Sequence, residues 1–175
     1  MYVINMFGGP GSGKSTTAAG LFHLMKLKKY NVELVTEYAK DLTYEGRFTT
    51  LKNQLYVTGC QFQRMERMRD KVDFLITDSP MLFGLMYAPP EYPQSFRNMV
   101  VDFHNMFNNI NVMIGRSKEY TPLGRNHNEE QARWLDKECL EILHHKKIRP
   151  GNYIKVDGDP DAAANILKAV EAKKL

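Results

Sequence analysis

The sequence predicts an α/β fold in three layers, with a parallel β-sheet between two layers of helices, in a single domain over residues 1–175. Two observations support this prediction. Short apolar segments typical of strands alternate with longer segments of helical periodicity, and a glycine-rich stretch separates the first strand from the first helix. Strands that alternate with helices pair in parallel, because each crossover helix returns the chain to the same edge of the sheet.

Five strands and five helices are expected, and several carry a signal of their own. The strands are predicted at residues 2–7, 32–36, 73–77, 111–114 and 153–156, and the helices at 17–25, 51–69, 94–108, 129–146 and 161–173. The third strand is a nearly continuous apolar run, as expected for a strand covered on both faces. The fourth helix follows a capping residue, Asn128, and has Glu129 and Glu130 in its first turn.

The connecting segments are polar or rich in glycine and proline. Residues 42–50 predict a loop or a short helical turn, and residues 117–128 predict a mobile loop. Residues 81–93 hold three prolines among large apolar side chains, which predicts an irregular segment near the substrate. Loops that follow parallel strands share one edge of the sheet, and α/β proteins bind their ligands there.

Composition narrows the class of protein. Lysine and arginine outnumber aspartate and glutamate by 24 to 20, an excess that suits an anionic ligand but indicates nucleic acid only if it is clustered. Cys60 and Cys139 lack metal-ligand spacing, so we expect neither a disulfide framework nor a zinc site. No apolar run approaches the roughly 20 residues of a membrane span, and the chain opens on a core strand. We therefore expect a soluble, cytoplasmic protein without a membrane partner.

Residues 8–15 fit the phosphate-binding pattern G-x-x-x-x-G-K-[ST] at every position, between a strand and a helix. The glycines let successive backbone N–H groups turn toward an anion, and the helix N-terminus adds partial positive charge. Lys14 is expected to reach the β- and γ-phosphates of a nucleotide, and Ser15 to bind Mg²⁺. The predicted ATP contacts in this P-loop are Gly9, Gly11, Ser12, Gly13, Lys14, Ser15 and Thr16.

Two carboxylates end neighbouring strands of the predicted sheet. Asp78 closes the apolar run at 74–77, and its carboxylate would hold Mg²⁺ or receive the proton of an acceptor. Glu37 ends the second strand and could act as a general base or bind a sugar hydroxyl. The alternatives are that Asp78 only caps the turn before Pro80 and that Glu37 is an exposed acid that opens a loop.

Cations for the transferring phosphate are expected in a lid over residues 116–128. Arg116 and Arg125 lie on either side of this segment, and the planar guanidinium group binds phosphate oxygens in two places. Closure of such a lid excludes water from the reaction. With Lys14, Glu37 and Asp78, these two arginines complete the predicted catalytic set.

Four further residues are candidates for binding the acceptor. Tyr38 follows Glu37, and Arg47 could bind an acceptor phosphate, although a single loop arginine is more often solvated. Gln61 and Arg64 share one face of the predicted helix at 51–69. An inward Gln61 could read the edge of a base, whereas solvent-facing polar side chains are the simpler interpretation.

These motifs resemble the small P-loop nucleoside and nucleotide kinases, and most of all the ATPase and kinase group that includes the ribosylnicotinamide kinase domain. The resemblance rests on residues 8–16, Glu37, residues 78–80, Arg116 and residues 124–125. It implies a five-stranded sheet of order 2-3-1-4-5, ATP as phosphate donor and Mg²⁺ as cofactor. It also implies that Lys14, Arg116 and Arg125 bind phosphates and that the turn at Asp157 borders the adenine of ATP.

The acceptor is less clearly indicated than the donor. The second strand lacks the Asp-Arg or Arg-Gly-Arg pairs of adenylate and thymidylate kinases, and residues 81–93 match no acceptor signature. Compact kinases of this type also occur in bacteriophage genomes, where some phosphorylate hydroxymethyl-pyrimidines in DNA. We therefore expect an ATP- and Mg²⁺-dependent kinase of a nucleoside, nucleotide or related small molecule. The alternatives are a kinase of a modified base in DNA and a P-loop ATPase or switch.

Overall fold

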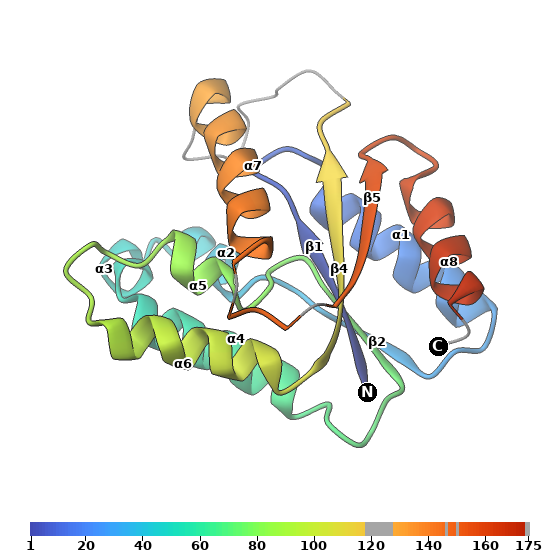
Figure 1. The fold of residues 1–175 in the computed structure, drawn as a ribbon, viewed down its shortest axis with the longest axis horizontal. Helices are drawn as coiled ribbons and strands as arrows, with labels where there is room; N and C mark the ends of the chain where they lie inside the picture. The colour runs from blue at the N-terminus through green and yellow to red at the C-terminus, as the bar shows by residue number, and fades with distance from the viewer. Residues whose placement is uncertain (118–127, 146, 150, 174–175) are drawn as a thin grey trace.

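A computed structural model describes residues 1–117, 128–145, 147–149 and 151–173. Five parallel strands form one sheet in the order β2-β3-β1-β4-β5 (Figure 1). The strand with the P-loop, β1, is thus central, between β3 and β4. This arrangement confirms both the predicted parallel sheet and the strand order implied by the resemblance.

The described segments contain the following elements. The strands are β1 (Tyr2–Phe7), β2 (Val32–Val35), β3 (Phe74–Thr77), β4 (Asn108–Gly115) and β5 (Asn152–Asp157). The helices are α1 (Lys14–Leu27), α2 (Tyr38–Tyr44), α3 (Phe48–Lys52), α4 (Gln54–Glu66), α5 (Phe83–Met86), α6 (Gln94–Asn105), α7 (Glu129–Leu143) and α8 (Ala162–Ala172). Among the described residues, no helix is long and apolar enough to cross a membrane.

Alternate residues of β1 divide the core into two layers. Ile4 and Met6 pack into the apolar cluster formed with α1 and α8, whereas Val3 and Phe7 belong to clusters formed with α4, α6 and α7. Successive side chains of a strand point to opposite faces, so both faces of a central strand must be apolar when helices cover both. Figure 1 shows α1 and α8 on one side of the sheet and α4, α6 and α7 on the other.

The predicted start of the helix after residue 128 is confirmed in detail. Asn128 accepts a hydrogen bond from the backbone N–H of Gln131, and the Gln131 side chain accepts one in return from the N–H of Asn128. This reciprocal pair satisfies two N–H groups that the helix itself leaves unpaired. It fixes the first turn of α7, the helix that the site uses below.

Some predicted boundaries are wrong. The helix expected at 51–69 is divided at Asn53, whose side chain caps α4 by accepting the Tyr56 N–H, and α4 ends at Glu66. Residues 42–50 contain helical residues of α2 and α3, in agreement with the short helical turn predicted there as one alternative, whereas the segment at 81–93, expected to be irregular, contains α5. The strand expected at 111–114 begins at Asn108, in register with Tyr2. A capping residue inside an apolar pattern and polar residues inside a strand hid these boundaries.

Candidate active site

The P-loop folds as its glycine pattern predicts. Gly11 and Gly13 have φ angles of 81° and 99°, a backbone conformation that side chains disfavour. Gly13 is the N-cap of α1, so the loop leads directly into the helix N-terminus. Ser15 and Thr16 are exposed in the first turn of α1, which leaves their hydroxyl groups accessible to a metal ion or a phosphate.

Lys14 turns back over the loop that precedes it. Its Nζ donates to the carbonyl oxygens of Gly8 and Gly9 at 2.7 and 3.1 Å. Burial lowers the pKa of Lys14, and the nearby acids Glu37, Asp78 and Asp136 oppose that shift. The ammonium group is therefore poorly hydrated but surrounded by negative charge, which favours strong interaction with a phosphate.

Glu37 stands between β2 and α2, at the N-cap of that short helix. Burial raises the pKa of its carboxyl group; the charge of Lys14 lowers it and the charge of Asp78 raises it further. A raised pKa brings a carboxylate closer to the range in which it can both accept and release a proton near neutral pH. The structure thus places Glu37 within the electrostatic reach of the P-loop lysine, and it is not a solvated acid on a loop.

Asp78 follows β3 and is only 4% exposed. Its Oδ1 atom is buried and has no hydrogen-bond partner among the described residues. A buried carboxylate oxygen without a partner is costly, and a cation would satisfy it. Mg²⁺ binds commonly through one or two carboxylates, a hydroxyl and substrate phosphates, so Asp78 and Ser15 fit this ion. No group of three or more His, Cys, Asp or Glu side chains with metal-binding geometry occurs in the described part of the chain.

Asp136, on α7, is a residue that the sequence analysis missed. Its Oδ1 accepts the Gly9 N–H at 2.5 Å, and its Oδ2 accepts from Nε and Nη2 of Arg116 at 3.2 and 3.1 Å. The Arg116 side chain is 6% exposed and also donates through Nη1 to the Pro10 carbonyl. The same carboxylate therefore joins the P-loop to the arginine predicted to bind phosphate. A single acid among several in a helix gives no sequence signal for this role.

The turn after β5 closes the other side of the P-loop. Gly158 donates its N–H to the Gly115 carbonyl at 2.7 Å. A Cβ at this position would lie 2.2 Å from the backbone oxygen of Ser12, so only glycine allows so close an approach. Asp157 is exposed at the end of β5, in register with Gly115. It thus lies next to Gly158, the residue that approaches the P-loop, and its predicted contact with adenine stays a prediction.

Three predicted acceptor residues lie on α2 and α4, and Arg47 lies at the start of α3; several are engaged with protein groups. Arg64 pairs with Asp41, and its guanidinium carbon lies 4.8 Å from the centre of the Tyr38 ring. Arg47 is exposed and pairs with Glu45. Gln61 is 4% exposed, so the interpretation of a solvent-facing glutamine is wrong for this residue. The other lid arginine, Arg125, lies outside the described residues.

Comparison with known proteins assigns the chain to a family. Residues 3–161 match the family described as AAA domain. The chain belongs to this family. A search of curated proteins gives no match.

Two solved structures share the fold, both of deoxyadenosine kinase from M. mycoides. The complex with bound dATP has a TM-score of 0.55 and 20% sequence identity over 98% of this chain and 99% of that one. The complex with the products dCMP and a flexible dCDP has a TM-score of 0.57 and 20% identity over 99% and 100%. The family match supports the predicted P-loop family, and the two structures show the fold of a P-loop kinase.

In this AAA domain, the segment after Asp78 also reaches the P-loop. The Lys14 Nζ lies 5.7 Å from the centre of the Phe83 ring, and that ring packs edge-on against Phe7. Burial raises the pKa of Tyr87, and the negative charge of Glu37 contributes to the shift. Aromatic residues of α5 and the turn after it therefore line the same region as the carboxylates. The cluster of large side chains after Asp78 was the available signal.

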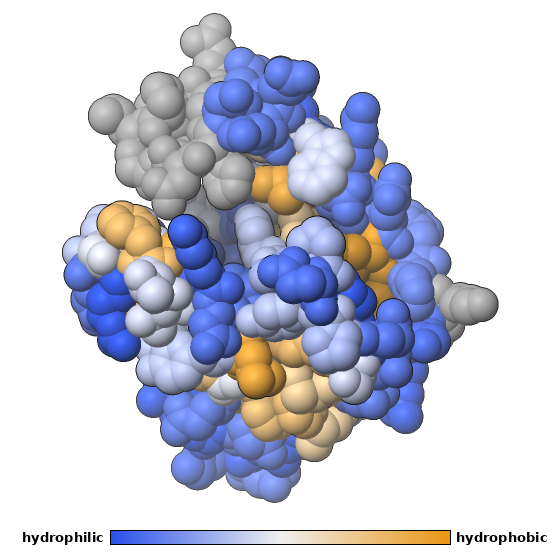
Figure 2. Space-filling model, turned by 90° about the vertical axis from the view of Figure 1, so that its left-hand side faces the viewer, coloured by the Kyte–Doolittle hydropathy of each residue, from blue (hydrophilic) through white to orange (hydrophobic). Residues whose placement is uncertain are grey.

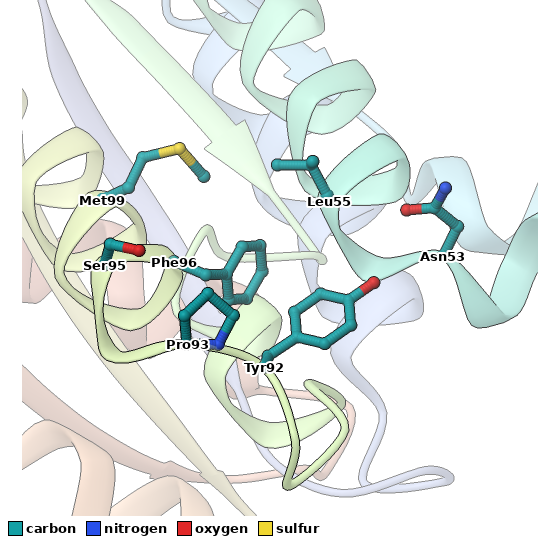
Figure 3. Close-up of a pocket in the computed structure, with 7 residues that line it drawn as sticks. All are labelled: Asn53, Leu55, Tyr92, Pro93, Ser95, Phe96 and Met99. Carbon is teal, nitrogen blue, oxygen red and sulfur yellow. The ribbon is translucent and has the colours of Figure 1, made fainter.

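The face formed by the helices after β2 and β3 also carries an apolar cavity. Figure 2 shows apolar patches (orange) between hydrophilic side chains on this side of the molecule. A cavity of about 540 Å³ opens between the start of α4 and the start of α6 (Figure 3). Its lining residues are Asn53, Leu55, Tyr92, Pro93, Ser95, Phe96 and Met99. Because none of them is charged, this cavity suits an apolar group and not a phosphate.

Proposed function

We propose that this protein is an ATP-dependent kinase that transfers the γ-phosphate to a hydroxyl or phosphate group of a nucleoside, nucleotide or related small molecule. The observation that carries the proposal is the placement of two acids that follow neighbouring strands, Glu37 and Asp78, within electrostatic reach of the half-buried P-loop lysine. Phosphate binding explains Lys14, but a half-buried carboxylate that follows the second strand suits a proton acceptor beside the γ-phosphate.

Different residues bind the donor phosphates and accept the proton of the acceptor. The backbone N–H groups of the P-loop and the Lys14 ammonium bind the donor phosphates and neutralise their charge. Arg116, held by Asp136, adds a cation beside the loop. Glu37 accepts the proton of the acceptor hydroxyl as the oxygen attacks phosphorus, because its raised pKa suits proton transfer near neutral pH. Phe83, which lies against Lys14, helps to exclude water from this side.

Mg²⁺ would be held by Ser15 and Asp78, where it supplies positive charge to the phosphate oxygens. The orphaned Oδ1 of Asp78, judged against the described part of the chain, supports this assignment. We accordingly assign the metal to Asp78 and the proton to Glu37. A carboxylate that is satisfied by a cation is a poor base, whereas one whose pKa is raised by burial is a better one.

An acceptor-dependence assay tests the proposal. The protein is incubated with ATP and Mg²⁺ and a panel of nucleosides, nucleotides and oligonucleotides with hydroxymethylated pyrimidines, and products are identified by mass spectrometry. We expect a phosphorylated product from at least one small-molecule acceptor and little hydrolysis of ATP without it. Steady hydrolysis with no phosphorylated acceptor would contradict the proposal and favour the ATPase or switch alternative.

The same panel separates a DNA acceptor from a small one. A DNA acceptor needs a positive surface that neutralises several phosphates, and its binding weakens steeply with salt. Two of the cations on the acceptor side, Arg47 and Arg64, are paired with acids, which lowers the positive field there. The small acceptor is therefore the one we propose, and transfer to the modified oligonucleotide alone would reverse that choice.

A further inference from the structure

Glu37 and Asp78 each lie next to backbone N–H groups to which a carboxylate could bind. Glu37 is the N-cap of α2, and the first N–H groups of a helix have no partner within the helix. Acidic side chains at a helix start usually accept from them. Within the described structure, however, the Glu37 side chain makes no capping hydrogen bond. The N–H group that directly follows Glu37 is open to an acceptor from elsewhere in the fold.

The side chain of Gln61 supplies that acceptor. Gln61 lies on α4, is buried, and accepts the Tyr38 N–H on its Oε1 at 3.0 Å. Tyr38 is the first residue of α2, so an amide from another helix holds the backbone directly after Glu37. Glutamine suits this position because its amide carries both a donor and an acceptor and no charge.

The other end of the same amide reaches β3. The Nε2 atom of Gln61 donates to the Thr77 hydroxyl at 3.4 Å, and that hydroxyl also accepts the Ser79 N–H at 3.1 Å. Asp78 lies between Thr77 and Ser79, and the next residue, Pro80, has no N–H. The nearest backbone donor is thus bound to Thr77, and the Asp78 Oδ1 has no partner in the described part of the protein.

We propose that Gln61 is a positioning residue that fixes the backbone beside both active-site carboxylates. Its amide bridges the turn after β2 to the end of β3: it accepts the Tyr38 N–H, next to Glu37, and donates to the Thr77 hydroxyl, which accepts the Ser79 N–H next to Asp78. Strands β2 and β3 are paired neighbours, with Val35 beside Thr77, so the bridge also sets the spacing of the two acids. The inference rests on the proposed kinase function.

Two substitutions remove the bridge from opposite ends. Gln61→Met keeps the side-chain length and loses both hydrogen bonds, and Thr77→Val keeps the shape and loses the hydroxyl. Each is expected to lower kcat on the order of 10²-fold, the effect of a small misplacement of catalytic groups, while KM for ATP stays unchanged. Gln63→Met, an exposed glutamine of the same helix, should match the wild type, and Thr77→Ser should recover most of the activity lost in Thr77→Val.

Thermal unfolding confirms that each variant is folded, and amide NMR follows the bridge directly. The Tyr38 amide resonance should move in Gln61→Met and the Ser79 resonance in Thr77→Val, with neither moving in Gln63→Met. Wild-type kcat in Gln61→Met, or equal losses in Thr77→Ser and Thr77→Val, would overturn the proposal. If the wild type phosphorylates no acceptor, the kinase proposal fails by itself, and an unmoved Tyr38 resonance in Gln61→Met then decides against the bridge separately.

Discussion

The donor half of the site, formed by the P-loop with Arg116 and Asp136, differs in construction from the acceptor half, formed by Glu37, Asp78, Gln61, Phe83 and Tyr87. Most of the donor half comes from consecutive residues between β1 and α1, and its chemistry lies largely in backbone N–H groups. The acceptor half takes side chains from the ends of two strands, from α4 and from the segment after β3.

This difference predicts separable defects. Local backbone geometry fixes the donor half, so damage there should appear as weaker ATP binding. The acceptor half depends on tertiary contacts such as those of Gln61 with Tyr38 and Thr77. Damage there should appear in kcat at unchanged ATP affinity, because such contacts act on the reacting groups and not on the donor.

The largest effect is expected from Lys14→Met. It removes the ammonium group that Glu37, Asp78 and Asp136 surround, and we expect phosphoryl transfer to fall on the order of 10³-fold with weaker ATP binding. Steady-state kinetics and calorimetric titration with ATP measure the two effects. Lys26→Met, an exposed lysine of the same helix, is the matched control. Full activity in Lys14→Met would remove the basis for the donor half.

Glu37→Gln should separate the two halves most sharply. Loss of the base lowers kcat roughly 10²- to 10⁴-fold, while ATP affinity stays at the wild-type value. Glu45→Gln, an exposed acid paired with Arg47, should leave both unchanged. Equal losses of kcat and ATP affinity in Glu37→Gln would show that the two halves are not separable.

The same variant tests the cause of the raised pKa of Glu37. Burial favours the protonated form, so the native state binds more protons than the unfolded chain above the ordinary glutamate pKa, and the free energy of unfolding falls as the pH rises. Glu37→Gln removes that cost and should be more stable than the wild type, by on the order of 1 kcal/mol. Urea unfolding should show that Glu37→Gln raises the free energy of unfolding more at about pH 7 than at about pH 4. A lower free energy of unfolding in the variant would indicate that the attraction of Glu37 to Lys14 outweighs the cost of burying its charge.

Asp136→Asn tests the tertiary part of the donor half. The substitution keeps the shape but weakens the hydrogen bonds to Gly9 and Arg116. We expect the free energy of unfolding to fall by about 1–3 kcal/mol and KM for ATP to rise roughly tenfold, which corresponds to about 1.4 kcal/mol. Glu129→Gln breaks an exposed ion pair with Arg133 on the same helix and should cost less than about 1 kcal/mol. Similar effects of the two variants would show that Asp136 does not stabilise the donor half through its bonds to Gly9 and Arg116.

Gly158→Ala should give the most local effect. The added Cβ meets the Ser12 carbonyl oxygen, part of the P-loop backbone, at 2.2 Å, so the loop must shift and ATP binding weakens by about 1–3 kcal/mol. Gly59→Ala places a Cβ in open space on α4 and should raise stability by up to about 1 kcal/mol. Equal ATP affinity in Gly158→Ala and the wild type, measured by calorimetry, would contradict this close contact as a determinant of the donor site.

Much of the fold could be predicted because its signals are local. Apolar runs mark the five strands, and the Asn128 cap marks α7. Where a local signal conflicted with its surroundings, the prediction failed. Asn53 stops a helix within a helical pattern, and Asn108 and Asn109 pair with β1 although both are polar. The hydrogen bonds that pair β4 with β1 join backbone atoms, so the less buried start of β4 tolerates polar side chains.

The sequence by itself determined the donor loop, since eight consecutive residues specify backbone geometry that needs no distant partner. It also indicated that Glu37 and Asp78 end parallel strands. Only the tertiary structure decided that both acids lie within electrostatic reach of Lys14, that Asp136 joins Arg116 to Gly9, and that Gln61 faces inward. Glutamine and aspartate on a helix have the same local preferences whether they face solvent or a buried N–H. Their roles follow from the packing of α4 and α7 against the sheet, a contact between residues far apart in the chain.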